Sequence, residues 1–207
     1  MERETVRFSM NKTEYIINIT KVRVYPQAYA AAITASDRLK ESKIANIIDI
    51  GGYTVDCLQL NSFKPNMNLC TSLYTGVRTL FDDINDIIRS TGAKDLDDSI
   101  IEGVLTKDAY YLAEYSPKKI AIIEDAAQKH VDKMLSEISQ KGFDLEEQKA
   151  VFMGGGSLLL KDYILKSKKA EKCIFIDDVY ANAKGYKLLY EAESKVVKQP
   201  NIGETNG

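Results

Sequence analysis

The chain has 207 residues, of which 44% are hydrophobic and 28% are charged, a composition typical of a soluble globular protein. Its formal net charge of -2 gives no sign of a surface for nucleic acid or for a membrane. No apolar run approaches the roughly 18 residues that a membrane-spanning helix needs. Three widely spaced cysteines without a Cys-x-x-Cys pair favour a reducing cytoplasm over a disulfide framework or a zinc site.

Apolar periodicity divides the chain into short strands and amphipathic helices. Ser116 as N-cap and Pro117 at the first helical position predict the start of the longest helix, and Gly142 predicts its end. Pro65 and two asparagines near it predict a loop. In chain order we expect strands at 6–10, 15–19 and 21–25, a helix at 27–39, two strands within 44–60, a strand at 69–74, helices carrying the apolar residues of 80–88, 99–105 and 120–138, a strand at 150–153, a helix at 158–166, a strand at 173–176 and a helix at 181–194.

The stretch Ile44–Leu60 contains the first glycine cluster. Gly51 and Gly52 join its two strands, and a glycine pair leaves backbone N–H groups uncovered, so that a phosphate can approach the main chain. Asp49, just before the turn, is suited to hold a hydrated metal ion against that phosphate. An ordinary hairpin with one satisfied carboxylate explains this stretch equally well.

The second glycine cluster, Gly154-Gly155-Gly156-Ser157, follows a buried strand and precedes a helix. Ligands of α/β sheets bind at such junctions, beyond the carboxyl ends of the strands. The cluster is not a dinucleotide fingerprint, and the chain contains no P-loop motif. Taken alone, three glycines indicate a sharp turn as readily as a binding site.

Other candidates for chemistry are weaker. His130 is the single histidine and is expected at the surface or at the boundary of the core, so no Ser-His-Asp or Cys-His set is indicated. Asp82, Asp83 and Asp86 form an acidic helix face, which is ordinarily just solvated.

Four segments in order carry a family resemblance. Asp49–Asp56 resembles the second phosphate-binding motif of the actin, sugar-kinase and heat-shock chaperone ATPase superfamily, and Val151–Ser157 resembles its adenosine motif. Tyr25–Ala31 is similar to its first connecting segment, and Ala181–Tyr186 to its second connecting helix. Within the superfamily, the style of these segments resembles the bacterial actin-like proteins of the ParM (StbA) type, which segregate plasmids.

The resemblance implies an α/β fold, namely an actin-like (ribonuclease H-like) domain with a mixed sheet flanked by helices. Family members begin with Asp-x-Gly-x-Gly, a first phosphate loop that this sequence does not contain. The chain therefore resembles the second half of such a protein, and complete hydrolysis is not expected from it alone. The implied divisions are the last strands of a first domain with a connecting helix at 1–43, the second, nucleotide-binding domain at 44–180, a returning helix at 181–194 and a disordered tail at 195–207.

The resemblance also implies roles for single residues. Gln27 would orient the water that attacks the γ-phosphate, and Asp49 would hold magnesium through water; Gly76 is a further candidate near the nucleotide. The implied cofactors are ATP or GTP with magnesium, and the implied partners are further copies in a filament and a DNA-bound adaptor protein. The residues that would contact or support the nucleotide are Gly51, Gly52, Tyr53, Thr54, Asp56, Gly154, Gly155, Gly156 and Ser157.

Two other functions stay open at this point. The chain resembles a fragment of a sugar kinase or chaperone ATPase as well, although a kinase would usually place Asp or Glu where Gln27 stands, as a base for the sugar hydroxyl. The third possibility is a non-catalytic interaction protein whose glycine turns are only structural. In the ATPase interpretation, the two glycine clusters should face each other across one cleft, and the strands within 6–25 should lack a full core and expose their edges.

Overall fold

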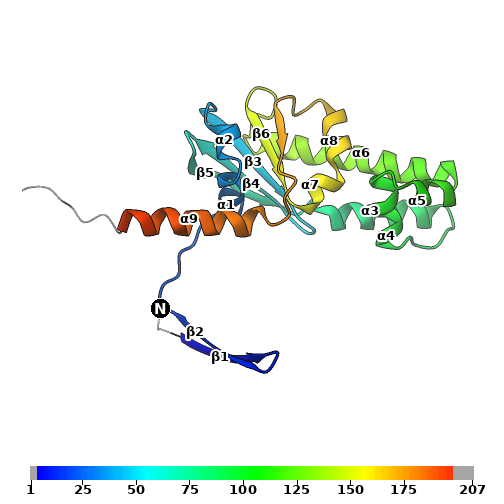
Figure 1. The fold of residues 1–207 in the computed structure, drawn as a ribbon. Coiled ribbons are helices and arrows are strands. Elements are labelled where there is room, and N and C mark those ends of the chain that lie inside the picture. The colour runs from blue at the N-terminus through cyan, green and yellow to red at the C-terminus, as the bar shows by residue number, and fades with distance from the viewer. Residues whose placement is uncertain (1–3, 198–207) are drawn as a thin grey trace, which may run out of the picture.

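A mixed five-stranded sheet forms the centre of the computed structural model, which describes residues 4–197 (Figure 1). The strand order is β5-β4-β3-β6-β7. The β3–β4 and β4–β5 pairs are antiparallel, whereas β3–β6 and β6–β7 are parallel. The strands are β3 (Ile44–Ile50), β4 (Val55–Asn61), β5 (Lys64–Leu73), β6 (Lys149–Met153) and β7 (Cys173–Phe175).

Helices cover both faces of this sheet because its central strands are apolar on both sides. In β3, Ile48 and Ile50 face a large core made with α3, α4, α6 and α8, whereas Ala45 and Ile47 face a smaller core made with α1, α2 and the start of α9. The helices are α1 (Gln27–Ile33), α2 (Ser36–Leu39), α3 (Val77–Ser90), α4 (Asp98–Leu105), α5 (Ala109–Glu114), α6 (Pro117–Gln140), α7 (Gly155–Leu159), α8 (Lys161–Ser167) and α9 (Ala181–Val197). None of the helices described is long and apolar enough to cross a membrane.

The start and end predicted for the longest helix are confirmed. The Ser116 hydroxyl accepts a hydrogen bond from the N–H of Lys119, and Pro117 is the first residue of α6. Gly142 follows the helix with φ of +99°, the left-handed conformation in which glycine commonly ends a helix. The expectation for His130 was wrong: it is buried in α6, and its Nε2 lies 3.1 Å from the carbonyl oxygen of Thr75.

The single helix expected at 27–39, a segment rich in alanine, is two helices, α1 and α2. The hydroxyl and the N–H of Thr34 both bond to the Ala31 carbonyl, at 2.7 and 3.0 Å, and α1 ends there. Helix α1 then crosses α9, where Gly185 meets Ala30: a Cβ on Gly185 would fall 1.7 Å from the Ala30 carbonyl oxygen.

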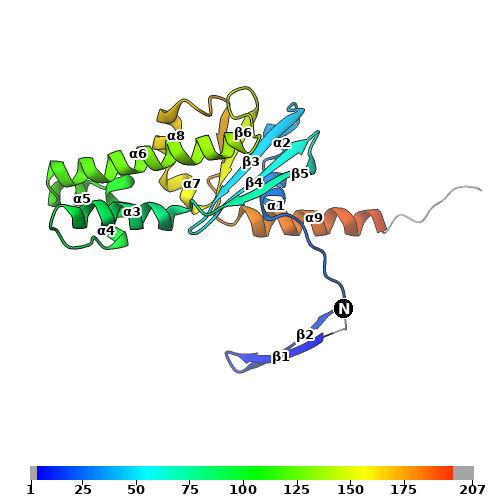
Figure 2. The same ribbon diagram turned by 180° about the vertical axis from the view of Figure 1, so that it is seen from behind.

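The N-terminal hairpin stands apart from the rest of the molecule (Figures 1 and 2). Strands β1 (Glu4–Met10) and β2 (Thr13–Ile19) pair only with each other, around a turn in which Asn11 and Lys12 have positive φ. The third strand expected at 21–25 is wrong, because this segment pairs with no other strand of residues 4–197. The apolar residues of the hairpin are exposed, as expected for strands without a core of their own.

Several element boundaries also differ from the predictions. The loop expected at Pro65 is part of β5, which begins after a tight turn at Ser62-Phe63, two residues with positive φ. Proline is tolerated there because β5 is an edge strand. Helix α5 was not predicted, and the helix expected at 158–166 is two short helices, α7 and α8. The disordered tail was placed too early, since α9 continues to Val197; residues 198–207 lie outside the described part.

Candidate functional site

The first glycine cluster forms the turn between β3 and β4. The N–H of Gly51 donates to the Thr54 carbonyl at 2.8 Å and closes a four-residue loop, 51–54. The hydroxyl of Thr54 donates to Asp56 at 3.1 Å, and Ser72 of β5 also donates to the Asp56 carboxylate. Asp56 therefore fixes the end of the loop against the sheet.

Helix α3 begins directly against this loop. The N–H groups of Gly76, Val77 and Arg78 donate to the carbonyls of residues 53, 51 and 52, at 3.3, 3.1 and 2.7 Å. These are N–H groups that a helix start cannot pair internally, so they fix the loop instead. Gly76 permits this contact, because a Cβ there would lie 2.6 Å from the Gly52 carbonyl oxygen.

The direction of the loop carbonyls determines the direction of the loop N–H groups. In a trans peptide the N–H points opposite to the preceding carbonyl. Because the carbonyls of Gly51, Gly52 and Tyr53 point to α3, the N–H groups of residues 52–54 point away from it. Among the residues described, none of these three N–H groups has a backbone acceptor. The loop thus presents a short row of unpaired donors, the arrangement that binds a phosphate.

The second glycine cluster lies beside the first because β6 runs parallel to β3, with Met153 paired to Asp49. Gly154 has φ of +84° and ψ of 163°, a conformation almost confined to glycine. A Cβ at Gly156 would lie 2.5 Å from Ile50 and 2.7 Å from Val77. The Ser157 hydroxyl is buried and donates back to the Gly154 carbonyl at 2.9 Å, whereas Gly155 has open space around it.

A cleft of about 510 Å³ lies between the two clusters and is lined by both, as expected. Sequence reasoning missed the part of its lining that α3, α4 and α7 contribute, since no motif marks those positions. The lining residues are Gly51, Gly52, Val77, Glu102, Thr106, Gly155, Gly156, Leu158 and Leu159.

Asp49 lies at the carboxyl end of β3 and is only 4% exposed. Its Oδ2 accepts a hydrogen bond of 3.0 Å from Nδ2 of Asn182, in the first turn of α9. Sequence reasoning noted Asn182 only as part of a connecting helix; a polar residue at the start of that helix was the signal available. Gln27 is the first residue of α1, and its side chain lies outside what the structure describes.

Part of the donor set needed for magnesium is present. Among the described residues there is no group of three or more acidic, histidine or cysteine side chains that could enclose a metal. Magnesium does not need one, because it commonly keeps several waters and binds through one or two carboxylates together with phosphates. Asp49 supplies one carboxylate, which packs against Gly154 of the second cluster. The buried Oδ1 of Asn182 is an acceptor without a partner among the residues described.

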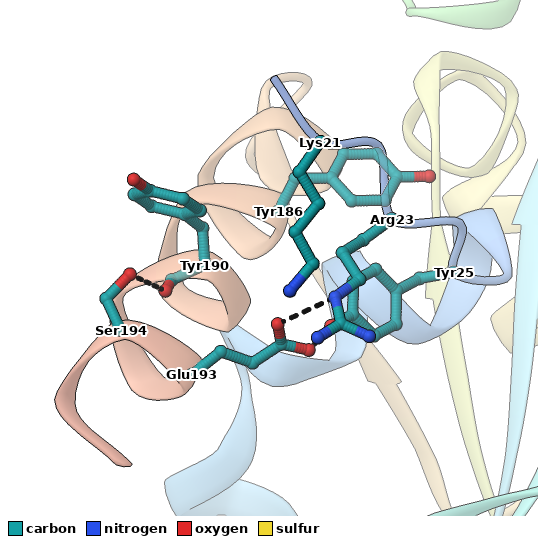
Figure 3. Close-up of a pocket in the computed structure, with 7 residues that line it drawn as sticks. All are labelled: Lys21, Arg23, Tyr25, Tyr186, Tyr190, Glu193 and Ser194. Carbon is teal, nitrogen blue, oxygen red and sulfur yellow. Dashed lines mark hydrogen bonds and ion pairs between the residues drawn. The ribbon is translucent and has the colours of Figure 1, made fainter. Parts of the chain in front are cut away.

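A second cavity, of about 550 Å³, lies between the segment that follows the hairpin and α9 (Figure 3). Its aromatic walls are Tyr25, Tyr186 and Tyr190. Glu193 accepts from Tyr25 and pairs with Arg23 at 3.1 Å, and these contacts attach the segment to the helix. The cavity contains neither glycine cluster, so it is separate from the site at Asp49.

Comparisons with solved structures identify the fold. An archaeal actin homologue, Ta0583 in complex with ADP, superposes with a TM-score of 0.69 at 20% identity, over 93% of this chain and 65% of that one. The Alp12 filament structure gives 0.68 at 18%, over 93% and 60%. A Bacillus thuringiensis ParM hybrid with ADP gives 0.63 at 15%, over 91% and 30%. The chain thus spans less than two thirds of the length of these proteins.

No protein with a curated description matches this sequence. The model of one sequence family does match, over residues 47–166, which run from within β3 to within α8 and include both glycine clusters. That match covers more than half of the chain and agrees with the mixed sheet and its flanking helices. The chain belongs to the family described as archaeal actin homologue MreB-like, C-terminal.

Proposed function

We propose that this chain is the nucleotide-binding second half of an actin-like ATPase that assembles into filaments. The observation that carries the proposal is the convergence of the two glycine clusters on one cleft. Asp49 lies next to the second cluster, where Gly154 packs against its carboxylate. Structures similar to this chain include an ADP complex and a filament, which supports nucleotide binding and self-association as functions of the fold.

In this proposal the nucleotide phosphates bind the N–H groups of residues 52–54. The loop is rigid before a ligand arrives, because three N–H groups of α3 and the side chain of Asp56 already hold it. Phosphoryl transfer depends on such positioning and on neutralisation of charge rather than on a covalent nucleophile. Gly155, which has open space around it, and Gly156 line the cleft and would border the nucleoside.

Bound magnesium would neutralise phosphate charge, and Asp49 would hold it through water. Burial of the Asp49 carboxylate and its bond to Asn182 fix its orientation. Gln27 at the start of α1 would orient the attacking water. A carboxamide aligns water but is not a strong base, which suits slow, switch-like hydrolysis. The nucleotide is ATP or GTP.

The hairpin is the part of the chain that we expect to pair with a further domain. On one face it presents Val6, Phe8, Tyr15 and Ile17, and the rings of Phe8 and Tyr15 stack with centroids 5.2 Å apart. These residues are 39 to 48% exposed, and both strands have an unpaired edge. We therefore assign residues 1–43 to the end of a first actin-like domain and its connecting helix, 44–180 to the second domain and 181–194 to the returning helix.

A finer assignment is plasmid segregation, as in proteins of the ParM (StbA) type, with a DNA-bound adaptor as partner and the cytoplasm as location. The similarity to ParM structures supports this assignment at the level of the fold. Copies of the chain, joined to a first domain, would form the filament, and the adaptor would connect it to DNA. Co-sedimentation of filaments with the plasmid-bound adaptor tests this role.

The nucleotide proposal is tested by titration of the ¹⁵N-labelled chain with ATP and with GTP, with magnesium or with EDTA. We expect the amide resonances of residues 51–54, 155 and 156 to shift, and the shifts to saturate at lower nucleotide concentration with magnesium. Asp49→Asn should remove the magnesium dependence, while the exposed Asp83→Asn, on α3, should keep it. Shifts that are absent from both glycine clusters at the highest nucleotide concentration would reject the proposal.

Two alternatives give different outcomes in the same experiments. A sugar-kinase fragment would show shifts at the glycine clusters with nucleotide and additional shifts with a sugar. A non-catalytic interaction protein would show no nucleotide response, and its glycine turns would only join elements of the sheet.

A further inference from the structure

Asn182 contacts the proposed cation site from α9. Its Nδ2 lies 3.0 Å from Oδ2 of Asp49, although 133 residues separate the two positions. A carboxylate offers only acceptors, so the carboxamide must turn its nitrogen toward Asp49. Its oxygen, Oδ1, is then directed elsewhere; it is buried and has no hydrogen-bond partner within residues 4–197.

The other oxygen of Asp49 is confined by the second glycine cluster. A Cβ on Gly154 would lie 2.4 Å from Oδ1 of Asp49, so only a glycine backbone fits there. The carboxylate is therefore held between the end of β6 and the start of α9. Neither contact belongs to the loop that would hold the phosphates.

The α1–α9 crossing determines where Asn182 lies. Gly185 is three residues later, about one helical turn, and it contacts the Ala30 backbone so closely that a Cβ would fall 1.7 Å from its carbonyl oxygen. Both sides of this contact are backbone or small side chains, so no side-chain rotation can make room if the two helices shift. A displacement of α9 along α1 therefore moves Asn182 relative to Asp49.

We propose that Asn182 is a positioning residue that fixes the orientation of the Asp49 carboxylate at the cation site. This inference rests on the proposed function, because it assigns a role at the same site. Docking of α9 on α1 and cation binding at Asp49 are then coupled: the cation stabilises the first turn of α9, and displacement of α9 weakens the cation site.

The first test compares nucleotide affinity with magnesium and with EDTA for the full chain and its variants. Asn182→Ala should lower the magnesium-dependent gain in affinity by about tenfold, because loss of a residue that orients a metal ligand commonly costs 10–100-fold. In an Asp49→Asn background it should have no further effect. Asn46→Ala, the matched control, removes a buried asparagine of β3 that bonds to Asp144 and Gln148. It should lower stability but leave the magnesium-dependent gain unchanged.

A second test needs no nucleotide and uses Mg²⁺ or Mn²⁺ alone. Asn182→Asp places a second carboxylate beside Asp49, so either cation should raise the melting temperature of this variant by several degrees more than that of the unmodified chain. The double variant Asp49→Asn, Asn182→Asp should lose this difference. If the unmodified chain binds no nucleotide, the proposed function fails in the first test, and this second test still decides the role of Asn182.

Urea unfolding of Asp49→Asn, Asn182→Ala and their double variant covers the case in which Asn182→Asp does not fold. Non-additive losses of stability are expected for two side chains in direct contact. Additive losses, a magnesium-dependent gain that survives Asn182→Ala, or an Asn182→Asp variant that is folded and indifferent to cations would each overturn the proposal.

Discussion

Gly185→Ala is the substitution that most directly examines how α9 docks on the domain. Alanine forms helix better than glycine by about 1 kcal/mol, so helix propensity alone predicts that the variant is more stable. The structure predicts the opposite. The added methyl group would lie 1.7 Å from the Ala30 carbonyl oxygen and 2.2 Å from its carbonyl carbon, whereas real contacts of this kind are not shorter than 3.0 Å.

The size of the effect follows from which atoms collide. Both close atoms of Ala30 belong to the backbone, so no rotamer change relieves the contact and the two helices must separate. Overpacking of a well-packed core costs about 1–3 kcal/mol, and we expect the upper end of this range before the helix-propensity gain is subtracted. The net loss is about 2 kcal/mol, which lowers the melting temperature by about 4–8 °C for a domain of this size.

The assay is thermal unfolding followed by circular dichroism, with amide hydrogen exchange of α1 and α9 on the same samples. Lys187→Ala is the control on the same helix: Lys187 is exposed and pairs with Glu191 only at 3.8 Å, so its loss should change stability by less than about 0.5 kcal/mol. A rise in melting temperature for Gly185→Ala, with unchanged exchange in α1, would refute the close crossing of the two helices.

Three further predictions concern single residues of the domain. Gly154→Ala should lower the free energy of unfolding in urea by about 3 kcal/mol, because a side chain at φ of +84° is strained and would meet Asp49. Gly155→Ala should be nearly neutral, because open space surrounds Gly155. Equal losses of stability in the two variants would contradict the geometry. Burial raises the pKa of the Cys57 thiol from 9.0 to about 12, so the unfolded chain loses this proton first and folding stability should fall between pH 9 and 12. In Cys57→Ala this fall in stability between pH 9 and 12 should be absent. Burial lowers the pKa of His130 below its ordinary 6.5, so the unfolded chain gains the proton first and folding stability should fall as the pH drops below 6.5. His130→Gln should flatten this part of a pH series of unfolding curves. A series that the substitution leaves unchanged would show that His130 is not buried.

Many of the elements could be predicted from the sequence because their signals are local. Ser116, Pro117 and Gly142 mark the ends of α6, and capping depends on a few neighbouring residues. The isoleucines of β3, although interrupted by Asp49, and the apolar residues of β6 indicated buried strands. The two glycine clusters indicated where backbone would be uncovered, and the sheet placed them side by side.

The errors have physical causes that are not local. The segment 21–25 alternates like a strand, but a strand also needs a neighbouring edge, and no described strand lies beside it. Pro65 indicated a loop, yet an edge strand tolerates a residue that cannot donate. His130 is buried because the Thr75 carbonyl, 55 residues earlier in the chain, satisfies its Nε2, and sequence periodicity does not report such a partner.

The sequence by itself determined which residue types are available at the candidate site: a carboxylate at the end of a strand, two clusters of glycines and a helix of small side chains. Tertiary structure alone decided how they act together. The parallel pairing of β3 with β6 places Gly154 against Asp49, and α3 directs the N–H groups of the loop outward. The crossing of α1 and α9 places Asn182 beside Asp49. These two residues lie far apart in the chain, so their contact depends on the close packing of the two helix backbones.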